Sequence, residues 1–580
     1  MCGIWAYIDY YNKKKINYYE YFMKLQHRGP DISSFINYNN IFIGFHRLAI
    51  MDTLFHANQP YILEKDTRIV IFICNGEIYN FKKLIKDHNL DITNNADCLV
   101  IPKLYLKYNY EIFTRLFKTS ICAEFAFILI EVNKYNKLQH IIVGRDKIGV
   151  RPLYTNKNNN ITNESIFSSE IKGIPETFQD ISEFEPGILL NLCFDDIGCY
   201  IDKSITNFNN IYYINSIPLT TEDYLAMIRH VVIESVKKRL DSDVPIVFLL
   251  SGGVDSSLIA AIASKILNKH IDTYCCGMIN GTDFEYARLV SHHIKSNHTE
   301  VIFTQEEGLN VIDDVIYTTE TWDTTTIRAS VGQYLVSKYI KEHSNAKVVL
   351  VGEGPDEVCS SYLFNYYAPS ATELHKAAKD YVSKIHMYDG RRADRCISRW
   401  GLECRIPFLD PDFIIAYWKI PAHFREPAYK NMEKWWLRAA FQDLNLLPQS
   451  ILWRRKEAFS DGISSCDKSW YQIIQEYIDT KIIDNNIVAP TKEAKYYKQK
   501  FIEYYGKERE NIIPQYWQPK WTSNTSNTNN TNNTNNTNNT NNTSNTNNTN
   551  NTSNTNNTNN TSNNIDNTYI DPSARTLDIY

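Results

Sequence analysis

The sequence predicts two folded domains of different classes, an α+β domain followed by an α/β domain with a parallel sheet, and then a disordered tract. The chain has 580 residues, 43% of them hydrophobic, and single cores stop growing near ~250–300 residues, so more than one core is expected. Short apolar runs separated by polar loops occupy residues 2–190, and amphipathic helices alternate with short apolar strands over residues 213–520. The first pattern favours a strand-rich domain, and the second favours parallel strands joined by helices.

The apolar runs typical of strands in the first domain lie at 41–51, 68–81 and 138–146. A polar stretch at 195–218 is predicted to be the linker between the domains. In the second domain, residues 224–240 carry apolar side chains at helical spacing, and residues 244–267 follow the order strand, glycine turn, helix. Residues 346–358 repeat the strand and turn. These alternations predict a sheet with helices on both faces.

A low-complexity tract at residues 522–564 consists almost entirely of Asn, Thr and Ser, followed by a C-terminal tail at 565–580. No apolar residue occurs in the tract before Ile565, so it has nothing to bury. It is therefore predicted to be disordered.

Composition excludes several classes of partner. The formal net charge is −5 and there is no long basic block, which argues against a nucleic-acid partner. No run approaches ~20 apolar residues, and the first residues lack the pattern of a signal peptide. We therefore expect a cytoplasmic protein without a membrane partner. The 12 cysteines form no C-x-x-C pair, so most are expected to be reduced, buried thiols.

Cys2 is the first candidate catalytic residue. It becomes the N-terminal residue if Met1 is removed, and its thiol then lies beside its own α-amine. An α-amine has a pKa of ~7.7–8.0 and is a usable base near neutral pH. Cys2 would thus supply both nucleophile and base. A cysteine at this position is uninformative by itself, and the motifs that follow it carry the argument.

These motifs are QHRGPD (26–31), GFHRLAIMD (44–52), NGEIYNF (75–81), EFAF (124–127) and GRDKIGVRPLY (144–154). With the MCGI start, they resemble the class II glutamine amidotransferases over residues 2–190. The resemblance implies an N-terminal nucleophile fold with αββα layers. In one departure, Ala123 stands where that family often has glycine, which is tolerable unless the backbone there needs a positive φ.

The resemblance also implies roles for individual residues. Arg47 would hold the α-carboxylate of glutamine, a geometry that suits a guanidinium. Asp97 and Glu77 would bind its α-ammonium group. Asn75 and the backbone N–H of Gly76 would form the oxyanion hole. The loop lining the pocket would be Arg47, Leu48, Ala49, Ile50 and Met51.

The second candidate site begins with SGGVDSS (251–257), which follows a predicted buried strand and opens a helix. Backbone N–H groups and a helix N-terminus in such a turn favour phosphate. The Lys of a Walker loop is missing. The segment resembles the pyrophosphate loop of the ATP-pyrophosphatase group, whose members adenylate a carboxyl or an amide.

Further segments narrow this resemblance: ETWDTTTIRAS (320–330), VGEGPDEV (351–358), DRCISRWGLECRIPFLD (394–410) and WRRKEAFSDGI (453–463). Over residues 213–520 they resemble the glutamine-dependent asparagine synthetases. DPSARTL (571–577) resembles the closing segment of eukaryotic-type members, so the Asn/Thr tract looks like an insertion into a C-terminal tail.

For this second domain the resemblance implies that Asp255 and Asp356 hold Mg²⁺, which prefers carboxylate and phosphate oxygens. Glu353 would assist attack by ammonia, and Lys456 would neutralise charge on the phosphates during adenylation. Asp323 and Arg328 would belong to the aspartate-binding region. The residues implied in ATP binding are Leu250, Ser251, Gly252, Gly253, Asp255, Ser256, Ser257, Cys276, Val351 and Gly352. Cys276 and Val351 depart from the family, which more often has an aliphatic residue and a serine there.

The implied reaction joins ATP, L-aspartate, L-glutamine and water to give AMP, diphosphate, L-asparagine and L-glutamate. It would pass through a glutamyl thioester on Cys2 and a β-aspartyl-AMP, with ammonia as an alternative nitrogen donor. The oligomeric state is left open, a homodimer being one option.

Several competing functions share part of these motifs. Amidophosphoribosyltransferase and glucosamine-6-phosphate synthase share only the first domain, and β-lactam synthetase lacks a working Cys2 site. A non-catalytic nucleotide-binding homologue would lose its charged catalytic residues first, and they are present here.

Overall fold

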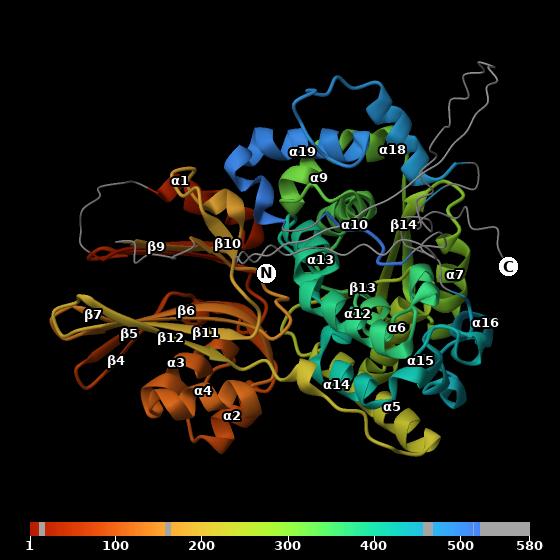
Figure 1. Cartoon of the computed structure of the whole chain (residues 1–580). Helices are drawn as coiled ribbons and strands as arrows, with labels where there is room; N and C mark the ends of the chain where they lie inside the picture. Colours follow the sequence, from red (N-terminus) through yellow and green to blue (C-terminus); the bar gives the residue numbers. More distant parts are fainter. Residues whose placement is uncertain (11–17, 157–163, 456–463, 465–467, 514–515, 522–580) are drawn as a thin grey trace, which may run out of the picture.

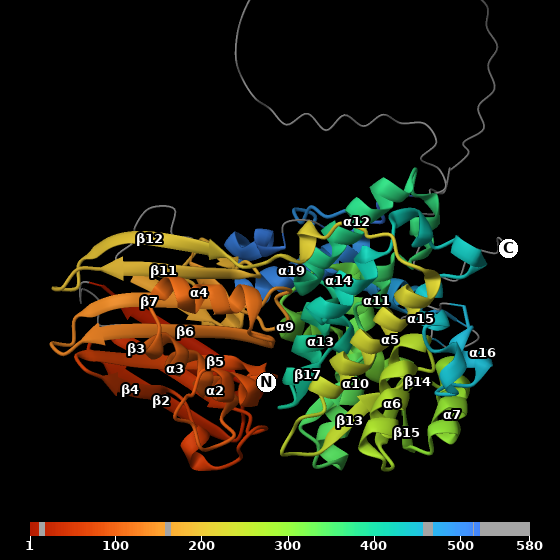
Figure 2. The ribbon, with the colours of Figure 1, turned by 90° about the horizontal axis from the view of Figure 1, so that it is seen from below.

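The computed structural model describes residues 1–10, 18–156, 164–455, 464, 468–513 and 516–521. The predicted disorder of 522–564 and the tail 565–580 lie outside the described residues, as does Lys456. Two bodies lie side by side, a β-rich one built from the first part of the chain and a larger α/β one (Figure 2). The N-terminus lies at their junction in both ribbon views (Figures 1 and 2).

The first domain consists of two stacked antiparallel sheets. In Figure 1, α1 lies outside one sheet, and α2, α3 and α4 lie outside the other, which gives the predicted αββα layers. The first sheet has the order β10 (Ile181–Glu183), β8 (Tyr154–Asn156), β9 (Glu164–Ser168), β1 (Gly3–Asp9), β3 (Ile41–Arg47) and β2 (Ile32–Tyr38). The second has the order β12 (Tyr200–Asn207), β11 (Ile188–Phe194), β7 (Leu138–Arg145), β6 (Ala123–Asn133), β5 (Arg68–Ile78) and β4 (Tyr61–Lys65). The helices are α1 (Tyr19–Met23), α2 (Phe81–Asp87), α3 (Val100–Lys107) and α4 (Tyr110–Thr119).

The alternation of side chains along each strand explains the layers. In β1, Ile4 and Ala6 belong to the apolar cluster that fills the space between the sheets. Trp5 and Tyr7 point to the opposite side, where Phe22 of α1 packs against Trp5. Each central strand is therefore buried on both faces, one against the other sheet and one against helices.

Strands lie in all three regions predicted for them in the first domain. The predicted linker at 195–218 is wrong in one respect, because it contains β12 at the edge of the second sheet. Most side chains of β12 are exposed, so its sequence lacks the apolar alternation that identifies a half-buried strand.

The second domain is built on a five-stranded parallel sheet with the order β15 (Asn297–Phe303), β14 (Asp272–Met278), β13 (Ile246–Leu249), β16 (Val348–Leu350) and β17 (Glu403–Arg405). Its helices are α5 (Thr221–Lys238), α6 (Val254–Leu267), α7 (Asp283–Ile294), α8 (Gln305–Asn310), α9 (Ile312–Thr319), α10 (Thr324–His343), α11 (Pro355–Cys359), α12 (Ala371–Lys384), α13 (Asp389–Ser398), α14 (Pro411–Lys419), α15 (Trp435–Ala439), α16 (Gln449–Leu452), α18 (Trp470–Asp479) and α19 (Lys492–Tyr505). The helix, strand and turn predicted within 224–267 and the strand and turn within 346–358 are all present.

The strand order locates a crevice. From β13 the chain moves outward through β14 to β15, and it then returns to β16 and continues in the other direction to β17. The connections therefore diverge between β13 and β16. In open parallel sheets, ligands bind beyond the carboxyl ends of the strands at such a switch point. Residues 250–257 and 351–358 follow these two strands directly.

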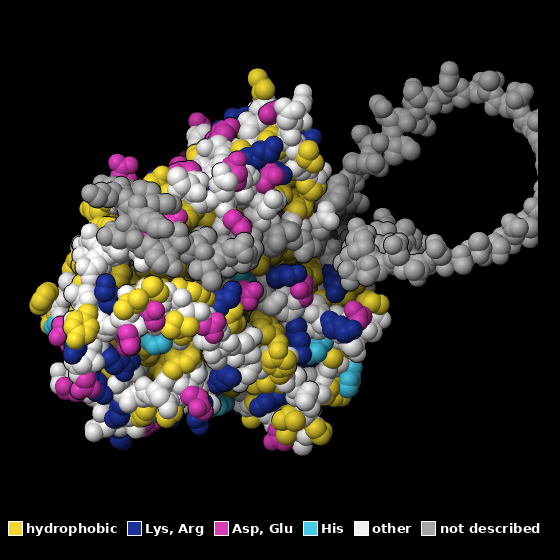
Figure 3. Space-filling view, turned by 60° about the vertical axis from the view of Figure 1, so that its left-hand side comes forward, with side chains coloured by type: hydrophobic (Ala, Val, Ile, Leu, Met, Phe, Trp, Pro, Cys, Tyr) yellow, Lys and Arg dark blue, Asp and Glu magenta, His cyan; other side chains and the backbone are white. Residues whose placement is uncertain are grey.

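Two surface properties bear on possible partners. No helix among the described residues is long and apolar enough to cross a membrane. On the face shown in Figure 3, Lys and Arg side chains are interspersed with Asp and Glu.

Candidate active sites

Cys2 lies immediately before β1, at the junction of the domains. Its backbone nitrogen donates to Oδ1 of Asn75 (3.0 Å), and its sulfur lies 3.8 Å from the carbonyl oxygen of Leu48. Its carbonyl oxygen accepts a hydrogen bond of 3.1 Å from Nε of Arg28. Three separate segments therefore fix the residue that the sequence indicates as the nucleophile.

The end of β5 faces Cys2. Because side chains alternate along a strand, Asn75 and Glu77 point to the same side as Ile71 and Ile73, which fill the space between the sheets. Nδ2 of Asn75 is buried and has no hydrogen-bond partner among the described residues. Such a donor costs free energy unless a ligand brings an acceptor. A developing oxyanion beside Cys2 would be a suitable acceptor.

Close packing against β6 explains the glycine at position 76. A Cβ atom at Gly76 would stand 2.4 Å from the carbonyl oxygen of Glu124 on the neighbouring strand. Ala123, the departure noted above, is the first residue of β6, and alanine adopts this extended conformation without strain.

Arg47 ends β3 and anchors the loop that follows it. Its guanidinium donates to the carbonyl oxygens of Leu54 (2.8 Å) and Asp52 and to Oδ1 of Asn58 (2.5 Å). Arg47 is buried together with the other residues of the predicted glutamine pocket, Leu48, Ala49, Ile50 and Met51. The structure therefore brings this loop to Cys2, and the contact of Arg47 with an α-carboxylate stays a prediction.

Asp97 and Glu77 form a buried acidic pair. A carboxylate oxygen of Asp97 accepts a hydrogen bond from the backbone of Ile78 (2.7 Å). Burial raises the pKa of Asp97 to about 6 and raises the pKa of Glu77 well above its ordinary value. Glu77 also lies 3.2 Å from the guanidinium of Arg405 on β17, a contact that the sequence did not reveal. Burial makes both carboxyl groups costly to ionise. A nearby cation such as an α-ammonium group would offset this cost.

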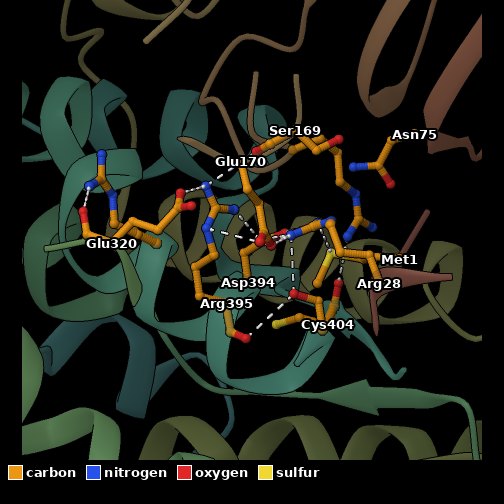
Figure 4. Close-up of polar contacts among 12 residues, drawn as sticks. Met1, Arg28, Asn75, Ser169, Glu170, Glu320, Asp394, Arg395 and Cys404 are labelled. Carbon is orange, nitrogen blue, oxygen red and sulfur yellow. Dashed lines mark hydrogen bonds and ion pairs between the residues drawn. The ribbon is translucent and has the colours of Figure 1, made fainter. Parts of the chain in front are cut away.

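Met1 blocks the chemistry predicted for Cys2. It is fully buried beside Arg28 (Figure 4), and its ammonium group donates to the carbonyl oxygen of Leu402 (3.2 Å). While Met1 is attached, the nitrogen of Cys2 is an amide and cannot act as a base. Burial raises the pKa of the Cys2 thiol to about 11, so little thiolate forms near neutral pH. Removal of Met1 would convert that amide into an amine beside the thiol.

The second site lies at the switch point of the parallel sheet. Gly252 has φ +77°, and a Cβ atom there would stand 2.4 Å from Cβ of Tyr286. Only glycine fits this turn. Gly253 then caps α6, whose N-terminus points its free N–H groups into the crevice. Gly352, after β16, packs so closely on this turn that its own Cβ would stand 2.8 Å from the nitrogen of Ser256.

A cleft lies above this turn. It is lined by most of the predicted nucleotide-binding residues, namely Leu250, Ser251, Gly253, Asp255, Ser256, Cys276, Val351 and Gly352, and also by Glu353 and Asp356. Gly252 and Ser257 do not line it. Gly252 shapes the turn from behind, and the Ser257 hydroxyl is buried. Four arginines that sequence reasoning missed also line the cleft, namely Arg392, Arg438, Arg454 and Arg455. Of these, Arg455 is exposed and Arg454 is partly buried, and both make the cleft suitable for phosphates.

Asp255 and Asp356 converge on the ammonium group of Lys434. Nζ of Lys434 lies 2.5 Å from a carboxylate oxygen of Asp255 and 2.6 Å from one of Asp356. One cation therefore reaches both predicted metal ligands at once, and this spacing fits a divalent ion at the same place. Lys434 is almost completely buried. The sequence did not identify it, because a single Lys before a short helix carries no signal of its own.

Glu353 lies beside the cleft. Its carboxylate accepts a hydrogen bond from Nε2 of Gln333 (3.0 Å) and lies 3.5 Å from the guanidinium of Arg392. Burial raises its pKa. Asp323 caps α10 through the backbone nitrogen of Thr326, and Arg328 makes a bidentate ion pair with Glu493. Neither lines the cleft, so their place in aspartate binding stays a prediction.

Two family models match the chain. One, described as a glutamine amidotransferase domain, matches residues 1–215, and the other, described as asparagine synthase, matches residues 227–384 and 368–529. A glutamine-hydrolyzing asparagine synthetase from Gallus gallus is 36% identical over 563 residues, covering 90% of this chain and 97% of that protein. Those from Bos taurus and Homo sapiens are 36% and 35% identical over 569 residues, with the same coverage.

Proposed function

This chain belongs to the family of glutamine-hydrolyzing asparagine synthetases, and we propose that it performs the two halves of that reaction at Cys2 and at the cleft beside Glu353. It has both domains that the reaction requires, and its similarity to the named enzymes extends over almost their whole length. It is therefore a glutamine-dependent ligase of amino-acid biosynthesis, as the motifs predicted. The residue roles below are our proposal.

In the first half-reaction, the α-amine of Cys2 accepts the thiol proton after Met1 is removed, and the sulfur attacks the side-chain amide of glutamine. The negative oxygen that develops is stabilised by Nδ2 of Asn75 and by the N–H of Gly76. The α-ammonium group of Cys2 returns the proton to the departing nitrogen, so ammonia leaves and a glutamyl thioester remains on Cys2. Water then hydrolyses the thioester, which releases glutamate and restores the thiol. Nδ2 of Asn75 supports this assignment, because it is buried and lacks a hydrogen-bond partner in the part of the chain that the structure describes.

In the second half-reaction, the β-carboxylate of aspartate attacks the α-phosphorus of ATP, giving β-aspartyl-AMP and diphosphate. For the phosphates, the cleft supplies N–H groups at the start of α6 and the guanidinium groups of Arg454 and Arg455. Ammonia then displaces AMP to give asparagine, and Glu353 assists its attack. Lys456, outside the described residues, is assigned to the adenylation step by its motif alone.

Asp255 and Asp356 are the residues that would hold Mg²⁺. The reach of both carboxylates to one buried ammonium group supports this assignment. Mg²⁺ would supply charge neutralisation for the diphosphate leaving group.

The position of β17 supports our proposal that ammonia passes directly from the first site to the second. Arg405 on β17 contacts Glu77 of the first site, and β17 pairs with β16, whose end leads to Glu353. An internal passage along this junction would keep ammonia from being protonated in bulk water. Ammonia added from solution would also serve as an alternative nitrogen donor for the second half-reaction.

A cytoplasmic location and a homodimer are further proposals. The scattered free cysteines of the described residues suit a reducing compartment. Cell fractionation and analytical ultracentrifugation test these two points.

The decisive experiment incubates purified protein with aspartate, Mg·ATP and glutamine and identifies the products. We expect asparagine, glutamate, AMP and diphosphate together. Formation of ADP in place of AMP would overturn the adenylation mechanism.

A further inference from the structure

Helix α13 contacts both candidate sites. At Asp394 it meets Arg28, which holds the carbonyl oxygen of Cys2. At Arg392 it meets Glu353, beside the cleft. The two helix residues are two positions apart, so their side chains leave the helix about 200° apart. The helix therefore lies between the two sites, with one side chain reaching toward each.

The contact with the first site is rigid. Arg28 is fully buried, and its two terminal nitrogens donate to the two carboxylate oxygens of Asp394 at 2.8 Å and 3.0 Å. A bidentate pair of this kind fixes the plane of the guanidinium. Glu170 (2.6 Å) and Ser398 (3.1 Å) accept further hydrogen bonds from it. Figure 4 shows Arg28 pointing toward Asp394 and Glu170. The remaining donor, Nε, is thereby aimed at the carbonyl oxygen of Cys2.

The contact with the second site is equally direct. Arg392 lies 3.5 Å from Glu353 and 2.6 Å from Asp389, one turn earlier on the same helix. Glu353 is assigned above to the attack of ammonia. Substrates that approach Glu353 therefore affect its ion pair with Arg392, a side chain of α13.

We propose that Asp394 is a positioning residue that links glutamine hydrolysis at Cys2 to occupancy of the synthetase cleft through α13. Substrates in the cleft change the contact between Glu353 and Arg392, and the helix transmits this change through Asp394 and Arg28 to the Cys2 carbonyl. This inference rests on the proposed function. Because coupling between two binding sites is reciprocal, filling the cleft should alter glutamine affinity, and couplings of this kind commonly amount to about 5-fold or more.

A purely structural role for the Arg28–Asp394 pair is the competing explanation. The chain offers a matched control in Glu183 of the first domain, whose side chain is only 8% exposed and pairs with Arg391 of the same helix at 2.8 Å. Within the part of the chain that the structure describes, Glu183 pairs with Arg145, His386 and Arg391 and contacts neither Cys2 nor Glu353. Glu183→Gln therefore removes an interdomain ion pair on α13 without touching the proposed link.

The experiment measures kcat/KM for release of glutamate from glutamine, with and without aspartate, Mg²⁺ and an ATP analogue that has a methylene between its α and β phosphorus atoms. This analogue fills the cleft without turnover. The wild-type protein and Glu183→Gln should both be stimulated by about 5-fold or more. In Asp394→Asn, which keeps the shape of the side chain but loses its charge, the ratio should fall to about 1.

A second variant, Arg28→Lys, breaks the bidentate link from the other side and should lose the stimulation in the same way. Ammonia-dependent asparagine synthesis and the melting temperature report whether each variant is folded. If Asp394→Asn does not fold, Arg28→Lys takes its place in the test. Unchanged stimulation in the folded variant, loss of it in Glu183→Gln, or no stimulation of the wild type would each overturn the link. Failure of the wild type to make asparagine would instead overturn the proposed function.

Discussion

Nζ of Lys434 lies 2.6 Å from a carboxylate oxygen of Asp356, and the same ammonium group lies 2.5 Å from Asp255. A buried lysine thus neutralises both of the acids expected to bind Mg²⁺. The two attractions outweigh the cost of burying the ammonium group, and the pKa of Lys434 is raised. Lys434 and a divalent ion would compete for the same carboxylates, so the lysine must yield to the ion or share its ligands.

Lys434→Met should therefore destabilise the metal-free protein, by about 2–3 kcal/mol, since two partly exposed carboxylates lose their common partner. Added Mg²⁺ should raise the melting temperature of the variant more than that of the wild type, because the ion replaces the missing charge. Thermal unfolding in chelator and in Mg²⁺ measures both effects. Lys376→Met, which removes an exposed pair with Glu373, is the control and should leave the melting temperature nearly unchanged. An equal response of wild type and Lys434→Met to Mg²⁺ would contradict the shared site.

Gly252→Ala should abolish ATP binding and cost about 2 kcal/mol or more in the free energy of unfolding. The alanine would have to keep φ near +77° and place its Cβ against Tyr286. Gly253→Ala is the matched control, because its Cβ would meet only Oγ of Ser251 at 3.5 Å. Denaturant unfolding and calorimetric titration with ATP measure the two quantities. The argument fails if both variants lose the same stability.

Glutamine affinity should decrease as the pH falls through about 6. Burial raises the pKa of Asp97 to about 6, so the carboxylate expected to bind the α-ammonium group is ionised only above that pH. The sign follows because protonation removes the negative charge that the ligand needs. Below this pH, Kd should rise by up to about 10-fold per pH unit, the limit for one proton.

The same raised pKa affects stability with the opposite sign. The folded protein binds this proton more tightly than the unfolded chain, so the contribution of Asp97 to stability is present below about pH 3.9 and is lost as the pH rises through about 6.

Glutamine binding is best measured in Cys2→Ala, which cannot hydrolyse the ligand. Asp97→Asn in that background should bind weakly at every pH from 5 to 7, and a constant Kd without this substitution would refute the assignment.

Glu353→Gln and Lys456→Ala should each impair asparagine formation with either nitrogen donor, since both residues are assigned to the synthetase half. A loss of about 100-fold or more is expected for a group that stabilises developing charge. Glutamate release without ATP should survive in both variants. Rates of ammonia-dependent synthesis at the wild-type level in either variant would remove that residue from the mechanism.

Much of this architecture could be predicted because its causes are local. The apolar runs that contain β3, β5 and β7 predict strands, and the glycine turn at 251–257 predicts a phosphate loop. The motif around Asn75 likewise predicts its place beside Cys2. The strands and the turn rest on residues close together in sequence, where the geometry follows from backbone sterics and side-chain periodicity, whereas the place of Asn75 rested on the resemblance to a family.

The features that could not be predicted depend on contacts between distant segments. Arg28 and Asp394 are 366 residues apart, and nothing near either residue indicates the other. Lys434 becomes meaningful only when folding brings it to Asp255 and Asp356. The linker prediction failed at β12 for a related reason, because an exposed edge strand takes its pairing from β11 and needs no apolar pattern.

Cys2→Ala is expected to separate the two halves of the enzyme. Removing the sulfur deletes the only nucleophile proposed for the glutamine amide, so glutamate release and glutamine-dependent synthesis should both be lost. The synthetase cleft is built from residues of the second domain. Ammonium salts should therefore still support asparagine formation with release of AMP, which product analysis with each donor measures.

Retention of Met1 should have the same effect as Cys2→Ala, by a different cause. The nitrogen of Cys2 then stays an amide that donates to Asn75, and the thiol, with its pKa raised to about 11 by burial, has no base beside it. Active protein should consequently begin with Cys2 on N-terminal sequencing, and blocking the aminopeptidase should lower glutamate release in proportion to the Met1 that remains.

Glutamine hydrolysis by Cys2→Ala would place the nucleophile elsewhere and overturn the first site. Loss of ammonia-dependent synthesis in folded Cys2→Ala would leave that site standing but show that the cleft cannot work without it.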